Sequence, residues 1–271
     1  HCEIEEGGTG FCGARACRGG VVTDENYGKV TALALDPIEK KPLSRFMPGK
    51  LILSVGSYGC NLRCPFCQNS DISWSKEELL LQGRAKQASP EKLAEIARSL
   101  VSEGNIGIAY TYNEPLIGYE FVRDCAKLVH EMGMKNVLVT NGTCETDVLL
   151  EILPYIDAMN VDLKGFSESY YRDILKGDRD TVLAFIERAN RDCHVEITTL
   201  IVPGFNDSVS EMKKISGWIK ELDNGEDIPL HITRFFPKFN MTDRDATNVK
   251  RIYELKQTAE ENLKYVYTGN C

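Results

Sequence analysis

Three cysteines, Cys60, Cys64 and Cys67, restrict the chemistry of this chain more tightly than any other residues. Thiolates at this spacing can hold three irons of a four-iron, four-sulfur cluster. A bacterial ferredoxin run continues with a fourth cysteine and a proline shortly after the third, whereas the next cysteine here is Cys125. An open coordination position is typical of a metal site that binds a small molecule. We therefore expect a [4Fe-4S] cluster with one iron available to an outside ligand.

A zinc site and a disulfide cluster are the alternatives for these cysteines. Structural zinc needs four ligands, and the histidines of the chain lie far from the cysteine loop without forming a His-x3-5-His pair; they are His1, His130, His194 and His231. Disulfide frameworks are typical of short secreted chains, whereas this chain has 271 residues and irregularly spaced further cysteines. The pattern favours the iron–sulfur cluster.

The composition limits the partners and the location of the protein. It contains 40 acidic and 32 basic residues, with a formal net charge of −8. Nucleic-acid binding needs a basic surface, so no nucleic-acid partner is expected. No apolar stretch is long enough to span a bilayer, so no membrane partner is expected either. Ten cysteines without a secretory segment predict a reducing cytoplasm.

Short apolar stretches alternate with longer amphipathic ones from residue 51 onward, which is typical of βα units with parallel strands. Strands are predicted at residues 51–55, 106–112, 136–140, 158–163, 194–202 and 229–235. Helices are predicted near residues 90–103, 115–132, 145–152, 178–191, 208–222 and 243–263. The predicted fold class is α/β, a partial (β/α)6 TIM-like barrel of residues 50–271, preceded by a small cysteine-containing extension of residues 1–49.

Several predicted strands carry polar side chains on one face. The alternation of side chains along a strand places Asn160, Asp162 and Lys164 on the same side. A closed eight-stranded barrel fills its interior with Val, Ile and Leu, so the polar faces indicate an open barrel whose lumen holds a polar ligand. Chemistry in such barrels lies at the carboxyl ends of the strands, and Cys60 follows the first predicted strand closely.

The Cys-x3-Cys-x-aromatic-Cys spacing, with Phe66 as the aromatic residue, resembles the signature of the radical S-adenosylmethionine (SAM) enzymes. Further segments extend the resemblance over most of the chain: residues 36–43 (Asp-Pro-Ile-Glu-Lys-Lys-Pro-Leu), 110–115 (Tyr-Thr-Tyr-Asn-Glu-Pro), 162–164 (Asp-Leu-Lys) and 265–270 (Tyr-Val-Tyr-Thr-Gly-Asn). Together they are similar to AmmeMemoRadiSam-system radical SAM enzymes, which are related to pyruvate formate-lyase-activating enzymes. The resemblance implies SAM as the ligand of the open iron.

The resemblance also implies which residues contact SAM. Glu114 stands where the family has a Gly-Gly-Glu-type element, which contacts the amino group of the methionine moiety. Asp162 and Lys164 correspond to groups that bind the ribose hydroxyls and the carboxylate, and Asn141 supplies a polar group at the rim. Alternatives remain open: Glu114 as an exposed acid at a helix start, Asp162 and Lys164 as a mutual ion pair, and Asn141 as a turn residue.

The N-terminal segment holds three further cysteines, Cys2, Cys12 and Cys17, among several glycines. The family resemblance implies a second metal site here, with zinc or an auxiliary cluster. Unligated thiols are the alternative, because three cysteines leave the ligand set incomplete.

The expected activity is that of a radical SAM oxidoreductase. It would cleave SAM reductively to a 5′-deoxyadenosyl radical that abstracts hydrogen from a substrate, with an electron from a donor such as flavodoxin or ferredoxin. Two substrate classes remain open: a glycyl-radical enzyme activated as a protein partner, and a small molecule or polypeptide modified directly. A non-catalytic iron–sulfur electron carrier is the alternative outside catalysis.

Overall fold

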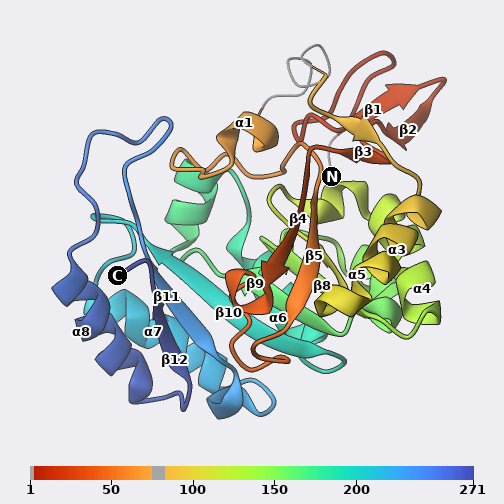
Figure 1. Cartoon of the computed structure of the whole chain (residues 1–271). Helices are drawn as coiled ribbons and strands as arrows, with labels where there is room; N and C mark the ends of the chain where they lie inside the picture. The colour runs from red at the N-terminus through yellow and green to blue at the C-terminus, as the bar shows by residue number, and fades with distance from the viewer. Residues whose placement is uncertain (1–2, 75–82) are drawn as a thin grey trace.

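An eight-stranded sheet forms the centre of the computed structural model, which describes residues 3–74 and 83–271 (Figure 1). From one edge to the other the order is β12-β11-β10-β9-β8-β7-β5-β4. The strands are β4 (Ala32–Pro37), β5 (Leu51–Gly56), β7 (Asn105–Tyr110), β8 (Lys135–Thr140), β9 (Ala158–Asp162), β10 (His194–Ile201), β11 (Leu230–Arg234) and β12 (Val266–Gly269). The six predicted strands are β5 and β7 to β11, and they run parallel. The predicted partial TIM-like barrel is confirmed.

Two strands of this sheet were not predicted from the sequence. β4 pairs antiparallel with β5, and β12 pairs parallel with β11, so both extend the sheet at its edges. Each has only four to six residues, which is too short for a clear pattern of apolar and polar residues. They form strands because they pair with β5 and β11.

Helices cover the outer face of the sheet (Figure 1). They are α3 (Pro90–Ser99), α4 (Tyr119–Glu131), α5 (Thr146–Ile152), α6 (Arg179–Ala189), α7 (Val209–Lys220) and α8 (Val249–Glu260). The side chains of Ser89, Asp178 and Ser208 accept backbone N–H bonds at the starts of α3, α6 and α7. The last helix begins later than the predicted residue 243, because Asn248 caps it. No helix among the described residues is long and apolar enough to cross a membrane.

Shorter elements complete the described chain. They are β1 (Arg15–Arg18), β2 (Val21–Asp24), β3 (Lys29–Val30), β6 (Lys86–Gln87), α1 (Ser70–Ser73), single helical turns at Ile38–Lys40, Val101–Glu103, Pro115–Gly118, Leu153–Tyr155 and Gly225–Asp227, and a π-helical turn at Tyr170–Leu175. The β1–β2 hairpin (red) and α1 lie at the same end of the molecule (Figure 1).

Residues 38–46, which we call the plug, fill the amino-terminal end of the barrel lumen. Ile38 and Leu43 are fully buried and belong to one cluster with the lumen-facing Ile52, Val137 and Ala158. These contacts involve the first halves of the strands, so the plug leaves the carboxyl end of the lumen open.

Two polar side chains of the sheet anchor the plug. The side-chain amide of Asn160 donates to the Pro42 carbonyl at 2.8 Å, and Glu196 accepts the backbone N–H groups of Ser44 and Arg45 at 2.9 and 2.7 Å. Residues 32–46 of the predicted extension therefore contribute to the sheet and to the core. The domain boundary at residue 49 stays a prediction.

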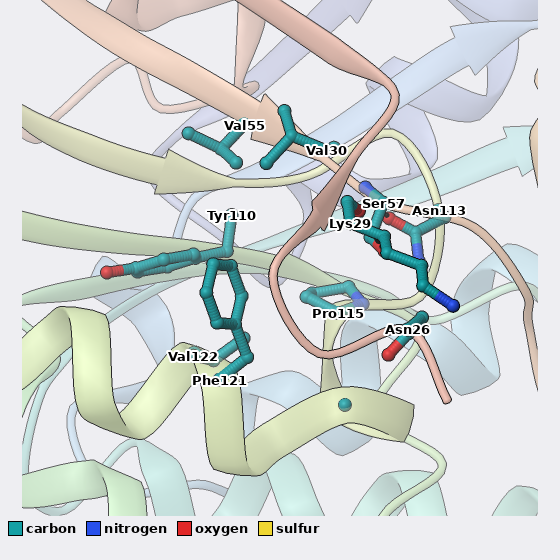
Figure 2. A pocket seen from close by; sticks show the side chains of 12 residues that line it. Asn26, Lys29, Val30, Val55, Ser57, Tyr110, Asn113, Pro115, Phe121 and Val122 are labelled. Atoms are coloured by element: carbon teal, nitrogen blue, oxygen red, sulfur yellow. Dashed lines mark hydrogen bonds between the residues drawn. The ribbon is translucent and has the colours of Figure 1, made fainter. Parts of the chain in front are cut away.

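The rest of the N-terminal extension lies against the core. Arg15 forms an ion pair with Glu120 at the start of α4, with Nη1 2.9 Å from Oε2. Figure 2 shows where this segment covers the helix-facing side of the sheet, with Val30 near Val55 and Lys29 near Ser57 and Asn113. The cavity left between them measures about 30 Å³, which is room for a single water molecule and not for a substrate.

Candidate functional site

A cavity of about 420 Å³ opens at the carboxyl ends of the strands. This volume lies within the range of small-molecule sites. All eight residues predicted from the sequence for the cluster and SAM line it: Cys60, Cys64, Phe66, Cys67, Glu114, Asn141, Asp162 and Lys164. They follow four different strands, β5, β7, β8 and β9, so the fold brings together residues that are up to about a hundred positions apart.

The cysteine loop is held in place from several sides. The backbone N–H of Cys60 donates to the Cys12 carbonyl at 3.1 Å, and that of Arg63 donates to the Leu175 carbonyl at 2.8 Å. Gly59 has a φ of +88°, and a Cβ there would lie 2.7 Å from the Cys12 carbonyl oxygen. The loop therefore needs glycine where the extension crosses it.

The three cysteines of the loop are the predicted cluster ligands, and the group that they hold stays a prediction. All three are free thiols. Within residues 3–74 and 83–271, no three His, Cys, Asp or Glu side chains converge on a point where one ion would sit. Zinc requires such convergence, with sulfur about 2.3 Å from the metal, whereas thiols that hold different corners of a cluster lie farther apart.

The thiols lie in a buried environment, and two hydrogen-bond donors face Cys60. The backbone N–H of Leu62 and the Asn141 side-chain amide donate to Sγ of Cys60, at 3.4 and 3.6 Å. Burial raises the pKa of the Cys64 thiol to about 11 and that of Cys60 further still. A positively charged group bound between them would favour the thiolates that iron requires.

Glu114 lies at the start of the helical turn Pro115–Gly118 and is 3% exposed. Its carboxylate accepts hydrogen bonds from the Thr140 hydroxyl at 2.7 Å and from the backbone N–H groups of Asn141 and Leu116 at 2.8 and 3.0 Å. Burial raises the pKa of Glu114 to about 7, although these hydrogen bonds act in the opposite direction. The alternative of an exposed acid at a helix start is right about the position, because Glu114 caps this helical turn, and wrong about the exposure, because the side chain is buried. Contact with SAM stays a prediction.

Asp162 and Lys164 form the ion pair that was the alternative to ligand binding. Nζ of Lys164 lies 2.9 Å from Oδ2 of Asp162, and both side chains face the cavity. The backbone N–H of Lys164 donates to the Tyr171 hydroxyl, which comes from the π-helical turn. The pair is thus held at the cavity wall by a neighbouring element, and its role toward SAM stays a prediction.

Asn141 and Phe66 complete the predicted set. The Asn141 side-chain amide donates to Asn61 Oδ1 at 2.9 Å as well as to Cys60, so it links the end of β8 to the cysteine loop. Its Oδ1 accepts from the Thr143 backbone, which is the turn contact of the alternative interpretation. Phe66 is buried and packs edge to face against Phe235, with 6.3 Å between the ring centroids.

The residues that line the cavity include several that were given no role from the sequence, among them Lys41, Tyr112 and Thr198. Lys41 belongs to the Asp-Pro-Ile-Glu-Lys-Lys-Pro-Leu segment and Tyr112 to Tyr-Thr-Tyr-Asn-Glu-Pro, and both segments carry the family resemblance. That resemblance was the available signal. The side-chain directions became known only when the plug was seen inside the lumen.

The predicted second metal site lies in part outside the described residues, which do not include Cys2. Cys12 and Cys17 are buried, and Sγ of Cys17 lies 3.7 Å from Oε2 of Glu6. The described part of the chain contains no three-residue metal-ion group at these cysteines. A second site stays a prediction.

The fold and this cavity define a class of protein. Residues 54–215 match the Radical SAM superfamily, and the chain belongs to that superfamily. Membership implies a [4Fe-4S] cluster and SAM, and it confirms the family resemblance.

The relatives come from two groups. An uncharacterized protein of Methanocaldococcus jannaschii is 39% identical over 272 residues, covering 100% of this chain and 79% of that protein. The pyruvate formate-lyase-activating enzyme of Clostridium pasteurianum is 30% identical over 177 residues, covering 64% of this chain and 71% of that enzyme. Among solved structures, QueE from Escherichia coli matches with a TM-score of 0.57 at 15% identity, covering 90% of this chain and 93% of that chain. The last similarity concerns the fold alone.

Proposed function

We propose that this protein is an enzyme that holds a [4Fe-4S] cluster with Cys60, Cys64 and Cys67 and cleaves SAM reductively to a 5′-deoxyadenosyl radical. The radical would abstract hydrogen from a substrate. One observation carries the proposal: three free cysteines line the same 420 Å³ cavity as Glu114, Asn141 and Lys164, which are predicted to contact SAM. An electron carrier has no need for such a cavity.

A cluster bound here would supply the electron that breaks the sulfonium bond of SAM. The residues of the chain would bind and orient. Lys164 and Asp162 present opposite charges 2.9 Å apart, so together they offer a donor for the carboxylate of SAM and an acceptor for its ribose hydroxyls. Asn141 and the Leu62 N–H stabilise the Cys60 thiolate by donating to its sulfur.

Glu114 would position Asn141 and, through it, the contact with Cys60. Its carboxylate accepts the backbone N–H of Asn141 at 2.8 Å, and it would also accept a hydrogen bond from the methionine amino group. Phe66, Val139 and Leu200 supply apolar surface of the cavity, which excludes water from a reactive intermediate.

We infer that the electron comes from flavodoxin or ferredoxin, as expected for an activating-enzyme-like member of this superfamily. The relative from Clostridium pasteurianum is named for activating pyruvate formate-lyase. This name supports a glycyl-radical enzyme as one candidate substrate, beside a small molecule or polypeptide that is modified directly. This activity would produce a glycyl radical in the partner protein, and electron paramagnetic resonance detects that radical directly.

The first test is Cys64→Ala, prepared and reconstituted anaerobically with iron and sulfide. We expect the variant to lose SAM cleavage, measured as 5′-deoxyadenosine formation after reduction, because one iron loses its protein ligand. Cys271→Ala is the control, since Cys271 is exposed and does not line the cavity. Retained 5′-deoxyadenosine formation in Cys64→Ala would refute the proposal.

A second measurement separates an enzyme from an electron carrier. Addition of SAM to the reconstituted, reduced protein should change the electron paramagnetic resonance spectrum of the cluster, because SAM binds its open iron. A spectrum unaffected by SAM would favour the carrier, and zinc alone in the purified protein would exclude both.

A further inference from the structure

The floor of the cavity is formed by the plug and not by the strands. Lys40, Lys41 and Pro42 line the cavity, while Ile38 and Leu43 of the same segment pack below them in the amino-terminal half of the lumen. Ile38 and Leu43 therefore close the floor on the side of the amino-terminal end of the lumen, and the cavity continues from the floor to the cysteine loop and the predicted SAM contacts.

Lys41 is a charged residue in a position where charge is costly. It is 2% exposed, and its Nζ lies 2.9 Å from Oδ2 of Asp36. Asp36 takes one of the three N–H donors of this ammonium group. Within the described part of the chain, no other oxygen accepts either of the remaining two. Buried donors without acceptors are unfavourable, so a ligand with acceptor oxygens would stabilise Lys41.

The charge of the floor favours an anion. Asp36 also accepts from Lys40 at 3.2 Å and from the Tyr112 hydroxyl at 2.8 Å. One carboxylate is thus set against two ammonium groups, that of Lys41 inside the cavity and that of Lys40, whose side chain is 66% exposed, at the edge of the cavity. The aromatic ring of Tyr112 lies 4.8 Å from Nζ of Lys41 and limits where the ammonium group can move.

The backbone of Tyr112 is strained in a way that serves this arrangement. Its φ is +75°, in the left-handed region that residues with a Cβ rarely adopt. Two hydrogen bonds hold Tyr112 in this conformation. Its backbone carbonyl accepts the side-chain amide of Asn69 at 2.7 Å, and its hydroxyl donates to Asp36. Such strain is concentrated at ligand sites, where the surrounding structure enforces it.

A second unpartnered polar group faces the same cavity. Thr198 on β10 is 6% exposed, and its hydroxyl has no hydrogen-bond partner among the described residues. It lies beside Asp162 in the sheet register. Thr198 therefore offers a hydroxyl between the plug and the predicted ribose contact.

We propose that the floor built by Lys41, Lys40 and Tyr112 is a substrate subsite that binds a carboxylate or a phosphate group of a small molecule. The anion would supply the acceptors that Lys41 lacks, and the rest of the molecule would extend toward the predicted SAM contacts. This inference rests on the proposed function for its chemistry. An internal polypeptide segment fits the floor less well, because its amides carry no charge to match the lysines.

The test is direct binding of two probes, inorganic phosphate and acetate, to the reconstituted protein with SAM bound and no reductant present. Bound SAM occupies Lys164, so the probes report on the floor. Line broadening in the ³¹P and ¹³C spectra gives the dissociation constants. We expect Lys41→Met to weaken binding at least tenfold, whereas Lys214→Met, which removes the same charge from an exposed position on α7, leaves it unchanged.

Two further variants keep the test decisive if Lys41→Met fails to fold with Asp36 unpaired. The double variant Asp36→Asn with Lys41→Met removes both charges of the pair. Thr198→Val keeps the shape of the side chain and should weaken binding of the preferred probe severalfold through the lost hydroxyl. Preference for phosphate or for acetate identifies the group that the substrate carries.

Three results would overturn the subsite. The first is that the Lys41→Met and Lys214→Met proteins bind the probes equally well, and the second is that the wild type binds neither probe. The third is that Lys41→Met forms a glycyl radical in a partner protein as well as the wild type does. Failure of the proposed function is distinguishable, because it would appear as absent SAM cleavage in a protein whose phosphate or acetate binding still depends on Lys41.

Discussion

The carboxylate of Glu114 accepts the backbone N–H of Asn141 at 2.8 Å, and the Asn141 side chain in turn donates to Sγ of Cys60 at 3.6 Å. The acid predicted to contact SAM therefore also fixes the group that supports a cluster cysteine. The predicted cluster ligands and the predicted SAM contacts thus share one chain of hydrogen bonds.

Glu114→Gln should change how the stability of the cluster-free protein depends on pH. Burial raises the pKa of Glu114 from 4.5 to about 7, so the fold favours the protonated acid. The protonated Glu114 therefore stabilises the folded protein, fully below pH 4.5. This contribution of about 3 kcal/mol to the free energy of unfolding is lost as the pH rises through about 7. Glutamine does not titrate, so the variant should show a flatter pH dependence in denaturant unfolding between pH 5 and 8.

The same variant should also be less stable by about 1–3 kcal/mol, because its NH₂ group faces donors that the carboxylate accepted. Glu131→Gln, at an exposed position, is the control. Parallel pH profiles for the wild type and Glu114→Gln would show that burial does not perturb this acid in the folded protein.

Lys164→Met should weaken SAM binding at least tenfold, about 1.4 kcal/mol or more, because it removes the predicted partner of the SAM carboxylate. Equilibrium dialysis with the reconstituted protein measures the affinity. Lys214→Met controls for the change in net charge. An unchanged affinity in Lys164→Met would mean that the pair with Asp162 is purely structural.

Gly59→Ala should loosen the cysteine loop. A Cβ at residue 59 would lie 2.7 Å from the Cys12 carbonyl oxygen and 2.8 Å from Cδ1 of Ile117, in a backbone with φ of +88°. We expect a destabilisation of about 1–3 kcal/mol and less iron retained after reconstitution. Gly217→Ala in α7 is the matched control, since nothing lies within 4 Å of its added Cβ. It should stabilise the helix by about 1 kcal/mol. Equal iron retention in both variants would contradict the role of Gly59.

Glu196→Gln should release the plug from the sheet. Burial by itself would raise the pKa of Glu196, but hydrogen bonds from His194 and His231 and from the Ser44 and Arg45 N–H groups outweigh it and lower the pKa to about 2. The resulting stability is present above pH 4.5 and is lost as the pH falls toward 2. The variant should lose about 3 kcal/mol at neutral pH and show a shallower acid transition by circular dichroism. If the variant unfolds in acid as the wild type does, groups other than Glu196 cause the acid sensitivity of the fold.

The sequence by itself determined the repeated βα units and the cysteine loop, because both signals are local. The apolar alternation marked β5 and β7 to β11, and the spacing of Cys60, Cys64 and Cys67 needs no distant residue to be recognised. Positions at strand ends, together with the family resemblance, were sufficient to place Glu114, Asn141, Asp162 and Lys164 on one cavity.

Only the tertiary structure decided what lies inside the lumen. Nothing in the run of Lys40, Lys41 and Pro42 shows which of the two lysines is buried, and only the fold of the plug places Lys41 in the core beside Asp36. The strand identity of β4 and β12 has the same origin. These features depend on contacts between segments distant in the chain, such as Glu196 with Ser44, and local propensity holds no information about such contacts.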